Sequence, residues 1–408
     1  MRIAVVGSGV AGLVAARLLH PGHEVTVFEA DTRVGGHVHT WDFDSGGRRW
    51  AVDSGFIVYN ERNYPRFSRL VAELGVATQP STMSFSVRSD RDGVEYNGGS
   101  LRQLFVQPGN AVRPSHLRML ADIVRFNRDA PRAIRNGAAH LALGAYLDRH
   151  RYSDAFRERY LLPMGSAIWS MPRARVLEMP AAFLVRFFEN HGLLGLRGRP
   201  QWRVIRGGSL RYVEALVAPF RDRIRMACPV RRVSRFSDRV EVNGEAFDRV
   251  VLACHSDQAL ELLADPTAAE REILGALPFQ ANDAVVHTDP GVLPRARAAW
   301  GAWNYLVTAA PEQPAAVTYN MNILQSLPAP ETFCVTLNPT VPIAPERVLG
   351  RVRYHHPLYT AAGVAAQARR GEISGVNRTH YCGAYWGHGF HEDGVVSAQA
   401  VVREVGIA

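Results

Sequence analysis

Three glycines near the start of the chain have a spacing that can bind a pyrophosphate. In the segment VVGSGVAG, Gly7, Gly9 and Gly12 follow the apolar run of residues 3–6 as G-x-G-x-x-G. The first glycine permits a tight turn, the second lets the backbone approach the phosphates, and the third allows close packing of helix on strand. A helix is expected over residues 11–19, and its N-terminal amides would point at the phosphates.

A carboxylate completes this motif. A second strand is expected over residues 25–28, and it ends at Glu29, whose carboxylate can accept hydrogen bonds from a ribose diol. The order of strand, glycine turn, helix, strand and acid predicts a dinucleotide site. A glycine-rich turn in some other α/β protein is the alternative interpretation.

The residues after Glu29 favour FAD over NAD. Arg33, Gly35 and Gly36 form an R-x-G-G segment, which would supply a second set of donors for a long, doubly charged cofactor. This segment resembles the second phosphate contact of flavoproteins in the amine oxidase and phytoene desaturase superfamily. The segment DSGFIVYN, from Asp53, resembles the one that runs beneath the flavin in those proteins.

The C-terminal segment resembles the other half of the same cofactor site. A strand is expected to end at Gly383, and a glycine-rich loop then leads to a helix starting near Gly394, whose N-terminus would stabilise negative charge on the reduced flavin. Members of the superfamily place an acidic residue after the strand-end glycine, whereas this chain has Ala384. In the middle of the chain, residues 207–216 resemble the glycine-led helix of the family, and Val230 matches a valine that holds the adenine by its backbone.

The resemblance therefore implies an FAD site built from both ends and the middle of the chain. The implied cofactor contacts are Gly7, Gly9, Val10, Ala11, Gly12, Glu29, Ala30, Arg33, Gly35, Gly36, His37, Gly55, Phe56, Ile57, Val230, Gly383, Gly394 and Val395.

The implied fold class is α/β, with a Rossmann-type, glutathione-reductase-like FAD-binding domain and a discontinuous α+β substrate domain. Residues 1–77, 206–279 and 346–408 are assigned to the FAD-binding domain, and residues 78–205 and 280–345 to the substrate domain. The 408 residues and an apolar content of 47% are sufficient for two domains of ordinary size.

Turn and helix signals organise the substrate domain. Asp92-Gly93 predicts a hairpin between two strand-like runs. A helical pattern follows over residues 115–134, with Ser115 as its expected N-cap, and alternating strand-like runs return over residues 280–345.

A narrower resemblance suggests the substrate. The segments DSGFIVYNERNYPRF, MSFSV and GFHEDG resemble a bacterial subgroup of FAD-binding proteins associated with cyclopropane-fatty-acyl-phospholipid synthases. This resemblance implies an enzyme that dehydrogenates or desaturates a lipid acyl chain, methylated or cyclopropanated, by hydride transfer to flavin N5. Two alternatives stay open: an amine oxidase-like oxidase of a small molecule, and a flavin-bearing, non-catalytic partner of a lipid methyltransferase.

A base is needed if a second C–H bond of the substrate is lost as a proton. The expected catalytic residues lie in the C-terminal loop: His388, His391 and Glu392. For each of them, a purely structural loop role is the alternative. The pair His355 and His356 would lie at the domain junction, and it lacks a third ligand at metal-site spacing, so no metal is expected.

Aromatic and polar side chains near the two flavin segments are candidates for substrate contact. They are Tyr59, Asn60, Tyr64, Tyr385 and Trp386. The first three have an alternative role as the cap of a helix beginning near Pro65. The chain contains no lysine, so it lacks the lysine that holds a water near flavin N5 in many amine oxidases.

The charge of the chain bears on its partners. All 47 basic residues are arginine against 38 acidic residues, giving a net charge of +9. No nucleic-acid-binding motif is present, so an anionic substrate or an anionic membrane surface is the expected partner rather than nucleic acid. The apolar and then basic segment of residues 181–202 would line an acyl channel or enter a lipid interface, with Arg197, Arg199 and Arg203 near headgroups; an ordinary core helix is the alternative.

The remaining sequence features bear on location and electron transfer. No signal peptide and no run of about 18 apolar residues is found, and the four cysteines are widely spaced, so we expect a cytoplasmic protein that lies at most peripherally at the inner face of the membrane. No second G-x-G-x-x-G is present to bind NADPH, so oxygen or a quinone is the expected electron acceptor.

Overall fold

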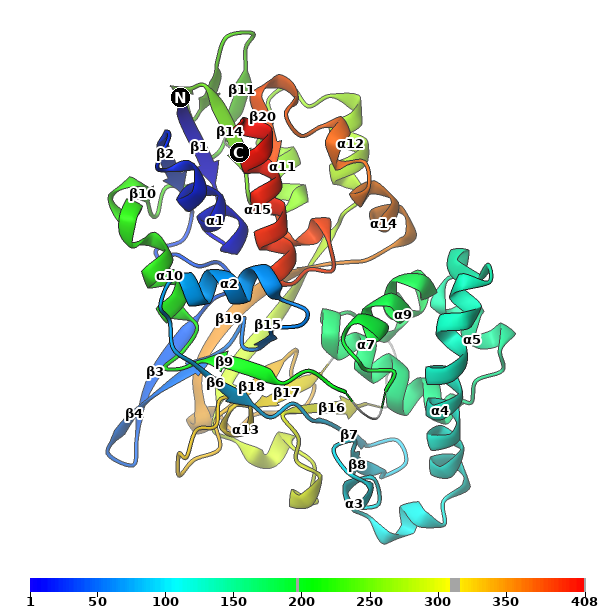
Figure 1. Ribbon diagram of the computed structural model, residues 1–408. Helices are drawn as coiled ribbons and strands as arrows, with labels where there is room; N and C mark the ends of the chain where they lie inside the picture. The colour runs from blue at the N-terminus through cyan, green and yellow to red at the C-terminus, as the bar shows by residue number, and fades with distance from the viewer. Residues whose placement is uncertain (196–197, 309–315, 407–408) are drawn as a thin grey trace.

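The computed structural model describes residues 1–195, 198–308 and 316–406. Within these residues, five parallel strands form one sheet in the order β10, β2, β1, β14, β20. Figure 1 shows this sheet at the top of the molecule, with the start of the chain and the last turn of α15 beside it. The strand bounds are Ile224–Arg225 (β10), Glu24–Phe28 (β2), Arg2–Val6 (β1), Arg249–Leu252 (β14) and Thr379–Tyr381 (β20).

The apolar runs of these strands are explained by burial on both faces of the sheet. Ile3 and Val5 of β1 pack on one side with α1, α10 and α15, while Ala4 and Val6 pack on the other side with the strands β11–β13 and the helices α11 and α12. A strand that is covered on both faces has no solvated positions, and its sequence is therefore continuously apolar. The helix bounds are Val10–Leu19 (α1), Leu210–Val217 (α10), Ser256–Leu262 (α11), Ala268–Gly275 (α12) and His391–Val405 (α15); the strand bounds are Val233–Arg235 (β11), Val240–Val242 (β12) and Glu245–Phe247 (β13).

The expected α/β class with a Rossmann-type FAD-binding sheet is confirmed by this arrangement. The predicted first helix and second strand agree with α1 and β2 to within one residue. Helix α15 begins at His391 rather than near Gly394. The carboxylate of Asp393 accepts hydrogen bonds from the amides of His388 and Phe390 at 3.1 and 2.9 Å, which allows the helix to start earlier.

A second, seven-stranded sheet lies below the first in Figure 1. Among the described residues its order is β19, β15, β18, β17, β16, β7, β8, and all neighbours are antiparallel except β16 and β7. The predicted hairpin at Asp92-Gly93 is confirmed, because β7 pairs with β8 and Gly93 has a φ of +70°. The bounds are Val348–Pro357 (β19), Phe279–His287 (β15), Cys334–Leu337 (β18), Val317–Asn320 (β17), Trp303–Val307 (β16), Phe85–Ser89 (β7) and Glu95–Asn97 (β8).

A helical lobe packs against the edge of this sheet, at the right in Figure 1. Its longest helix is α4 (Pro114–Arg135), which begins one residue before the predicted N-cap Ser115 because Pro114 takes the first helical position. The lobe has its own core, in which Phe126, Phe156 and Phe188 are fully buried. Its other helices are α3 (Leu101–Leu104), α5 (Leu143–Arg149), α6 (Asp154–Phe156), α7 (Leu162–Trp169), α8 (Arg173–Glu178) and α9 (Ala181–Asn190).

Short elements connect the two sheets. Helix α2 begins at Pro65, as predicted by the interpretation in which Tyr59, Asn60 and Tyr64 cap a helix. No described helix is long and apolar enough to cross a membrane. The connecting elements are β3 (Thr40–Ser45), β4 (Arg48–Asp53), β5 (Tyr59–Asn60), α2 (Pro65–Glu73), β6 (Thr78–Ser81), β9 (Trp202–Ile205), α13 (Met321–Leu324) and α14 (Ala361–Gln367).

The expected domain division differs from the strand pairing at β19, and β5 of the first expected domain also pairs with β9 of the second. Residues 346–408 were assigned to the FAD-binding domain, but β19 pairs along β15 in the seven-stranded sheet. The segment RVRYHHP alternates between exposed and more buried positions and has a partner strand of matching length, so it joins the sheet rather than the loops of the first domain. His355 and His356 are thereby placed beside His37, whose ring lies 5.3 Å from that of His356 and whose Nε2 lies 3.1 Å from the carbonyl oxygen of His355.

Candidate functional site

The glycine turn between β1 and α1 is shaped for close approach by a ligand. A Cβ atom on Gly12 would lie 2.0 Å from the carbonyl oxygen of Gly7, so only glycine fits there. Gly9 caps α1 without a side-chain acceptor for the first amides, and no atom lies within 4 Å of the position its Cβ would take. The free amides of the first turn and the open space above Gly9 fit the pyrophosphate of a dinucleotide.

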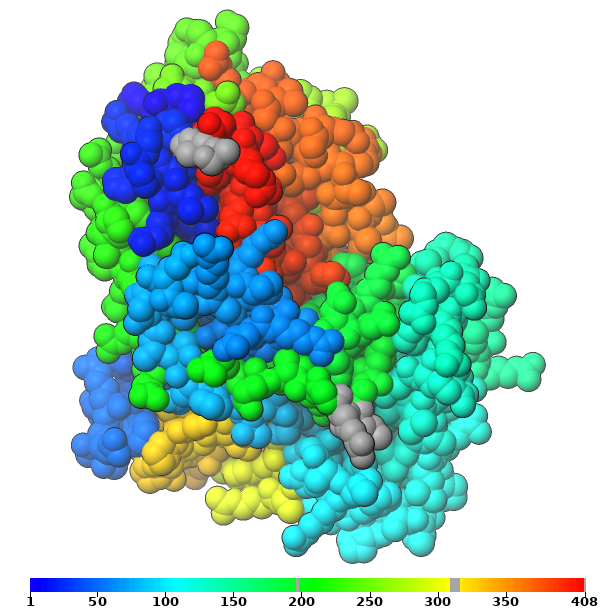
Figure 2. Space-filling model, in the orientation of Figure 1, coloured from blue at the N-terminus to red at the C-terminus, as the bar shows by residue number. Residues whose placement is uncertain are grey.

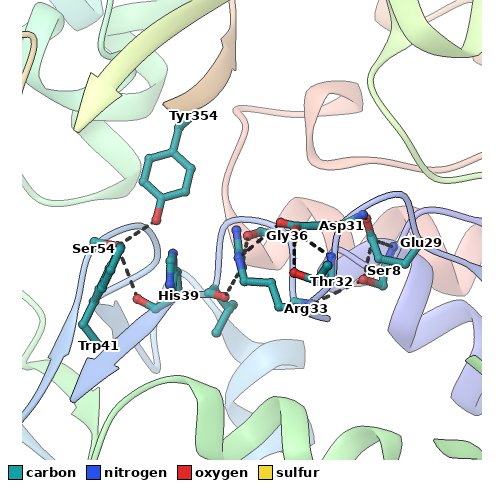
Figure 3. Close-up of polar contacts among 12 residues, drawn as sticks. Ser8, Glu29, Asp31, Thr32, Arg33, Gly36, His39, Trp41, Ser54 and Tyr354 are labelled. Atoms are coloured by element: carbon teal, nitrogen blue, oxygen red, sulfur yellow. Dashed lines mark hydrogen bonds and ion pairs between the residues drawn. The ribbon is translucent and has the colours of Figure 1, made fainter. Parts of the chain in front are cut away.

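Glu29 stands at the end of β2, as the motif requires, and its carboxylate is held firmly (Figure 3). It accepts hydrogen bonds from the amide of Ser8 at 2.9 Å, the hydroxyl of Ser8 at 2.5 Å and the amide of Asp31 at 2.8 Å. Ser8 lies inside the glycine motif, so the carboxylate and the phosphate-binding turn are fixed relative to each other. The expected ribose contact of Glu29 is compatible with this geometry.

The R-x-G-G segment lies against the first glycine turn. A Cβ on Gly36 would lie 3.0 Å from the Cα of Gly9, so the two loops touch. The guanidinium of Arg33 donates to the carbonyl oxygens of Gly36 and Val38 at 2.9 and 3.0 Å (Figure 3). Arg33 therefore stabilises the loop itself, and its expected direct contact with a phosphate stays a prediction.

The segment from Asp53 joins this loop from the other side. A Cβ on Gly55 would lie 1.9 Å from the carbonyl oxygen of His37, and the amide of Phe56 donates to that same oxygen at 3.0 Å. Phe56 in turn stacks on His391, with ring centroids 3.5 Å apart. Ile57 is buried in the core of the second sheet. The expected cofactor segments around His37 and Gly55 are thus in direct contact.

Asp53 itself is a buried residue that the sequence did not single out for a role. Its carboxylate accepts hydrogen bonds from the amide of Ser209 at 2.9 Å, the hydroxyl of Thr40 at 2.6 Å and the side chain of Gln325 at 3.1 Å. Burial raises its pKa to about 6, against the opposing effect of the Thr40 and Ser209 hydrogen bonds. Asp53 fixes the start of α10, the glycine-led helix, to the flavin segment.

The C-terminal glycines bring α15 to the same place. A Cβ on Gly394 would lie 2.7 Å from the side chain of Val10, so the first turn of α15 packs directly on the first turn of α1. The amide of Gly383 donates to the hydroxyl of Ser397 at 3.0 Å, which ties the end of β20 to α15. Ser397 is a residue that the sequence analysis did not select.

The other expected contacts lie around this centre or away from it. Ala11 and Val395 are buried in the core between α1 and α15, and Val230 packs at the margin of the core on the other face of the sheet. Ala30 is exposed just after Glu29. Their backbone contacts with FAD stay predictions.

Two of the three expected catalytic residues have structural partners. The carboxylate of Glu392 accepts hydrogen bonds from the amides of Arg66 and Phe67, at 3.1 and 2.9 Å, and so caps α2. The ring of His391 lies 2.9 Å from the hydroxyl of Tyr212, and burial followed by the charge of His37 lowers the pKa of His391 well below its usual range. The geometry does not favour either residue as the base.

His388 is placed differently. Its ring packs against Phe183 and Phe187 of α9, with centroids 4.7 and 5.7 Å apart, and its carbonyl oxygen accepts a hydrogen bond from the indole of Trp169 at 3.1 Å. Burial lowers the pKa of His388, so the imidazole is neutral at pH 7. Within the described residues its ring makes no hydrogen bond, so both nitrogens stay available to a substrate.

The five expected substrate contacts are mostly core residues. Tyr59 and Tyr64 pack with Phe67 under α2, and Asn60 caps the turn before that helix by accepting a hydrogen bond from Asn63 at 2.8 Å. The helix-capping alternative is therefore the one that the structure favours for this group.

Tyr385 and Trp386 lie on the far side of the C-terminal loop from the helical lobe. Tyr385 is buried against Gly383 and meets Phe279 edge to face at 5.8 Å. Trp386 packs at the margin of the core beneath α11 and α12. Their expected contact with substrate stays a prediction, and the aromatic side chains that meet the loop from the lobe are those around His388.

A group of histidines connects the second sheet to the cofactor segments. His37 stacks on Tyr354 with centroids 5.1 Å apart and lies 5.3 Å from the ring of His356. Burial, followed by the charge of His255, lowers the pKa of His37 to about 4, and burial lowers that of His356 to about 3. These imidazoles are therefore neutral, and no group of three or more His, Cys, Asp or Glu in the described part of the chain is placed to hold a metal ion.

Tyr354 makes a second contact between the seven-stranded sheet and the cofactor segments (Figure 3). Its hydroxyl lies 2.7 Å from the hydroxyl of Ser54, which accepts a hydrogen bond from the indole of Trp41 at 2.9 Å. In the sequence, the adjacent histidines His355 and His356 indicated this junction. Nothing in the sequence indicated that Tyr354 and Ser54 take part in it.

The segment of residues 181–202, for which a lipid-facing role and an ordinary core helix were both considered, contains a core helix. Phe183, Leu184, Val185 and Phe188 of α9 are buried in the lobe. Arg203 donates to the hydroxyl of Thr78 at 2.8 Å rather than pointing to solvent. Of the other two arginines, Arg199 is exposed and Arg197 lies outside the described residues. The structure favours the core-helix interpretation over a lipid-facing helix.

Residues 10–299 match the model of the family described as flavin containing amine oxidoreductase. The chain belongs to this family. The match covers more than two thirds of the 408 residues. It agrees with the glycine cradle, by which we mean the turns around Gly9, Gly12, Gly36 and Gly394 that come together from both ends of the chain. The cofactor of this flavin-containing amine oxidoreductase is FAD.

One curated relative shows how far the similarity extends in sequence. An L-amino-acid oxidase of Siganus canaliculatus is 25% identical over 267 residues, which make up 63% of this chain and 49% of that protein. The chain thus matches about half the length of this relative.

Solved structures show the similarity of fold. Cyclohexylamine oxidase from Brevibacterium oxydans IH-35A matches with a TM-score of 0.68 at 16% identity, over 99% of both chains. A CLA-producing fatty acid isomerase from P. acnes matches with a TM-score of 0.68 at 15% identity, over 99% of this chain and 98% of that one. One fold therefore serves proteins named for amines and for fatty acids.

Proposed function

We propose that this flavin-containing amine oxidoreductase oxidises an uncharged, apolar substrate, and that the substrate is a lipid acyl chain. The observation that carries the proposal is the aromatic group around His388. Trp169, Phe183 and Phe187 of the lobe meet the loop that leads into α15, next to the place where α15 packs on the phosphate-binding end of α1. An apolar wall at this position favours a hydrocarbon chain over a charged molecule.

The electrostatics of the junction support an uncharged substrate. Burial keeps His37, His356 and His388 neutral, and the buried carboxylates of Asp53 and Asp393 are occupied by backbone amides. A cationic amine that entered this region would lose its hydration without gaining a free carboxylate partner, which is costly. A hydrocarbon loses nothing by the same transfer.

Bound FAD would supply a hydride acceptor for the C–H bond that is broken. The residues that would hold it are those of the cradle, Gly9, Gly12 and Gly36, together with Glu29 and Gly394. The chain's own tasks are then to orient the acyl chain, to exclude water and to accept a proton. Neutral His388 is the residue we assign to that proton, because its ring nitrogens are not engaged within the described residues and burial, which lowers its pKa, leaves it unprotonated at neutral pH.

The finer assignment goes to acyl chains carrying a double bond, a methyl branch or a cyclopropane ring, because the C–H bonds adjacent to the double bond or ring, or at the branch point, are weakened and suit hydride removal. The resemblance to proteins associated with cyclopropane-fatty-acyl-phospholipid synthases supports this choice, as does the existence of a fatty acid isomerase with the same fold. Oxygen or a quinone would reoxidise the flavin.

The second candidate is oxidation of a small amine or amino acid. It is favoured by the similarity to an L-amino-acid oxidase and by the shared fold of cyclohexylamine oxidase. The absence of lysine from the whole chain and the neutral junction weigh against it.

The test is anaerobic reduction of the bound flavin, and the loss of its visible absorbance is the quantity measured. The panel contains unsaturated, methyl-branched and cyclopropane phospholipids, their free fatty acids, and a set of amines and amino acids. We expect lipids to bleach the flavin and amines to leave it oxidised. Bleaching by amines alone would replace the acyl-chain proposal with the second candidate.

A matched pair of variants sharpens the same test. His388→Phe keeps a ring among Phe183 and Phe187 and is expected to slow reduction by lipid about 100-fold, because the proton acceptor is lost. His20→Phe changes a histidine on the far end of α1 and is expected to leave the rate unchanged. Equal rates in both variants would remove His388 from the reaction without touching the lipid assignment.

A further inference from the structure

Exposed apolar side chains gather on one part of the helical lobe. Of the ten large apolar side chains that are exposed in the described residues, four lie between residues 101 and 124, and the other six are scattered. The four are Leu101, Val112, Leu117 and Val124, with exposed fractions of 77%, 80%, 43% and 62%. Single exposed apolar residues need no explanation, whereas a group of this kind marks a contact surface.

The local structure brings these four side chains onto one side of the lobe. Leu117 and Val124 are seven residues apart on α4 and lie on the same face, with the exposed Ala121 between them. Val112 lies two residues before α4. Leu101 lies on α3, which is tied to the first turns of α4 because His116 bonds to the carbonyl oxygen of Leu104 at 3.1 Å.

The opposite face of α4 is fully committed to the core of the protein. Met119, Phe126, Ala130 and Ile134 are buried there. The solvent-facing side of α4 is also partly apolar, which is unusual for a surface helix. No described element covers this side.

Arginines surround the exposed apolar side chains. Residues 98–135 contain seven arginines and two aspartates, so this tenth of the chain carries five of the nine net positive charges. Both aspartates are neutralised by arginines within the helix: Asp122 is buried and pairs with Arg118 and Arg125, and Asp129 pairs with Arg128 at 2.7 Å. Figure 2 shows the cyan segment that carries these residues as the protruding lower right edge of the molecule.

We infer that this α4 surface, formed by Leu101, Val112, Leu117, Val124 and the surrounding arginines, docks on an anionic lipid bilayer. Isolated apolar side chains on a helix that lies in the interfacial plane can enter the headgroup region, while arginines beside them pair with lipid phosphates. Long arginine stems add apolar contact and keep the charge at headgroup level. An acidic protein partner is the less favoured occupant, because apolar side chains flanked by arginines along one helix match the interfacial plane of an anionic bilayer.

This inference goes beyond the proposed function and stands without it. The surface belongs to a different segment from residues 181–202, which contain the core helix α9. Peripheral docking through α4 would place an acyl-chain enzyme beside its substrate, but it would serve any reaction at a membrane.

The test is co-sedimentation of the full chain, loaded with FAD, with two kinds of vesicle: phosphatidylcholine alone, and equal parts of phosphatidylcholine and phosphatidylglycerol. We expect binding to the anionic vesicles only, and a decrease in binding as salt is raised. Leu117→Ser/Val124→Ser is expected to weaken binding about tenfold. Arg128→Gln/Arg132→Gln is expected to weaken binding by roughly 25-fold, from about fivefold for each arginine.

Control variants carry the same changes on the other domain. Met226→Ser/Val376→Ser removes two exposed apolar side chains, and Arg221→Gln/Arg223→Gln removes two exposed arginines; both should bind as the unsubstituted protein does. The FAD absorbance of each variant reports that it is folded. The inference is overturned if the unsubstituted protein binds neither kind of vesicle, which would leave an acidic protein as the occupant. It is also overturned if the α4 variants bind as tightly as their controls.

Discussion

Gly12 and Gly55 each lie where a methyl group would collide with a backbone carbonyl oxygen. These contacts explain why the two segments around the cofactor tolerate no side chain at those positions. Gly9 differs, because the space above it is open, and that space faces the free amides of α1. At the scale of single residues, then, the site depends on glycines, because a side chain at these positions would collide with the backbone or fill the space open to the cofactor.

Substitution of Gly12 tests this cradle. Gly12→Ala places a methyl group 2.0 Å from the carbonyl oxygen of Gly7, so α1 must shift away from β1. We expect FAD affinity to fall at least tenfold and the free energy of unfolding to fall by about 2 kcal/mol. Gly275→Ala, where no atom lies within 4 Å of the new methyl group, should change neither quantity. Fluorescence titration with FAD and urea unfolding measure the two effects, and equal FAD affinity in both variants would contradict the cradle.

Glu392 gives a second test at the residue scale, because a cap and a base respond differently to substitution. Glu392→Ala removes the acceptor of the Arg66 and Phe67 amides, so we expect a loss of about 1 kcal/mol in the free energy of unfolding. The rate of flavin reduction in the folded protein should stay within about twofold of the original, measured by stopped-flow absorbance. A loss of reduction rate of 100-fold or more without a change in stability would restore Glu392 as the catalytic residue.

Helix α15 is the element that joins the parts of the site. Its first turn packs on α1 through Gly394, and Glu392 in the same turn caps α2. Its last turn is fixed to the central sheet by Glu404, which binds Arg370 at 2.7 Å, Ser374 at 2.6 Å and His380 at 3.0 Å. Because both ends of α15 are held, the loop containing His388 is held as well.

The interaction at the last turn predicts a dependence of stability on pH. Burial raises the pKa of Glu404, but the hydrogen bonds from His380 and Ser374 and the charge of Arg370 outweigh burial and lower it to about 2. A carboxylate whose pKa is lower in the folded state stabilises the fold above its unfolded pKa of about 4.3, and the stabilisation is lost as pH falls toward 2.

Glu404→Gln is therefore expected to cost about 2 kcal/mol at neutral pH, and the difference from the original protein should shrink below about pH 4. Glu372→Gln, which changes an exposed glutamate paired with Arg369, serves as the control and should show little effect. Denaturant unfolding followed by circular dichroism measures the free energy at each pH. A cost that stays constant from neutral to acid pH would contradict the assigned role.

The elements differ in how well the sequence predicted them. The glycine turn, β2 and the hairpin at Asp92-Gly93 could be predicted because each depends on neighbouring residues. The cap that Glu392 provides to α2 could not, because its partners lie 325 and 326 positions away. The core-helix interpretation of α9 is confirmed, although an apolar run alone does not separate a core helix from a lipid-facing one.

At the scale of the whole molecule, the two sheets meet through a few side chains. His37 and Ser54 of the cofactor segments contact Tyr354 of β19, and the lobe reaches the same region through α9 and His388. The sequence predicted two domains, but it assigned β19 to the first, because its strand partner β15 is separated from it by about sixty residues. The α4 surface lies at the outer edge of the lobe, away from the glycine cradle, so docking there would leave the cofactor-binding domain in solution (Figure 2).

The central claim is that glycine turns from both ends of the chain form one FAD site, and the most direct measurement is the binding of FAD to the purified protein. Titration of the cofactor-free chain with FAD, followed by quenching of flavin fluorescence, should show saturation at about one FAD per chain and raise the melting temperature, because FAD binds only the folded state. A chain that is folded by circular dichroism, remains colourless and neither quenches FAD nor gains thermal stability from it would contradict the account.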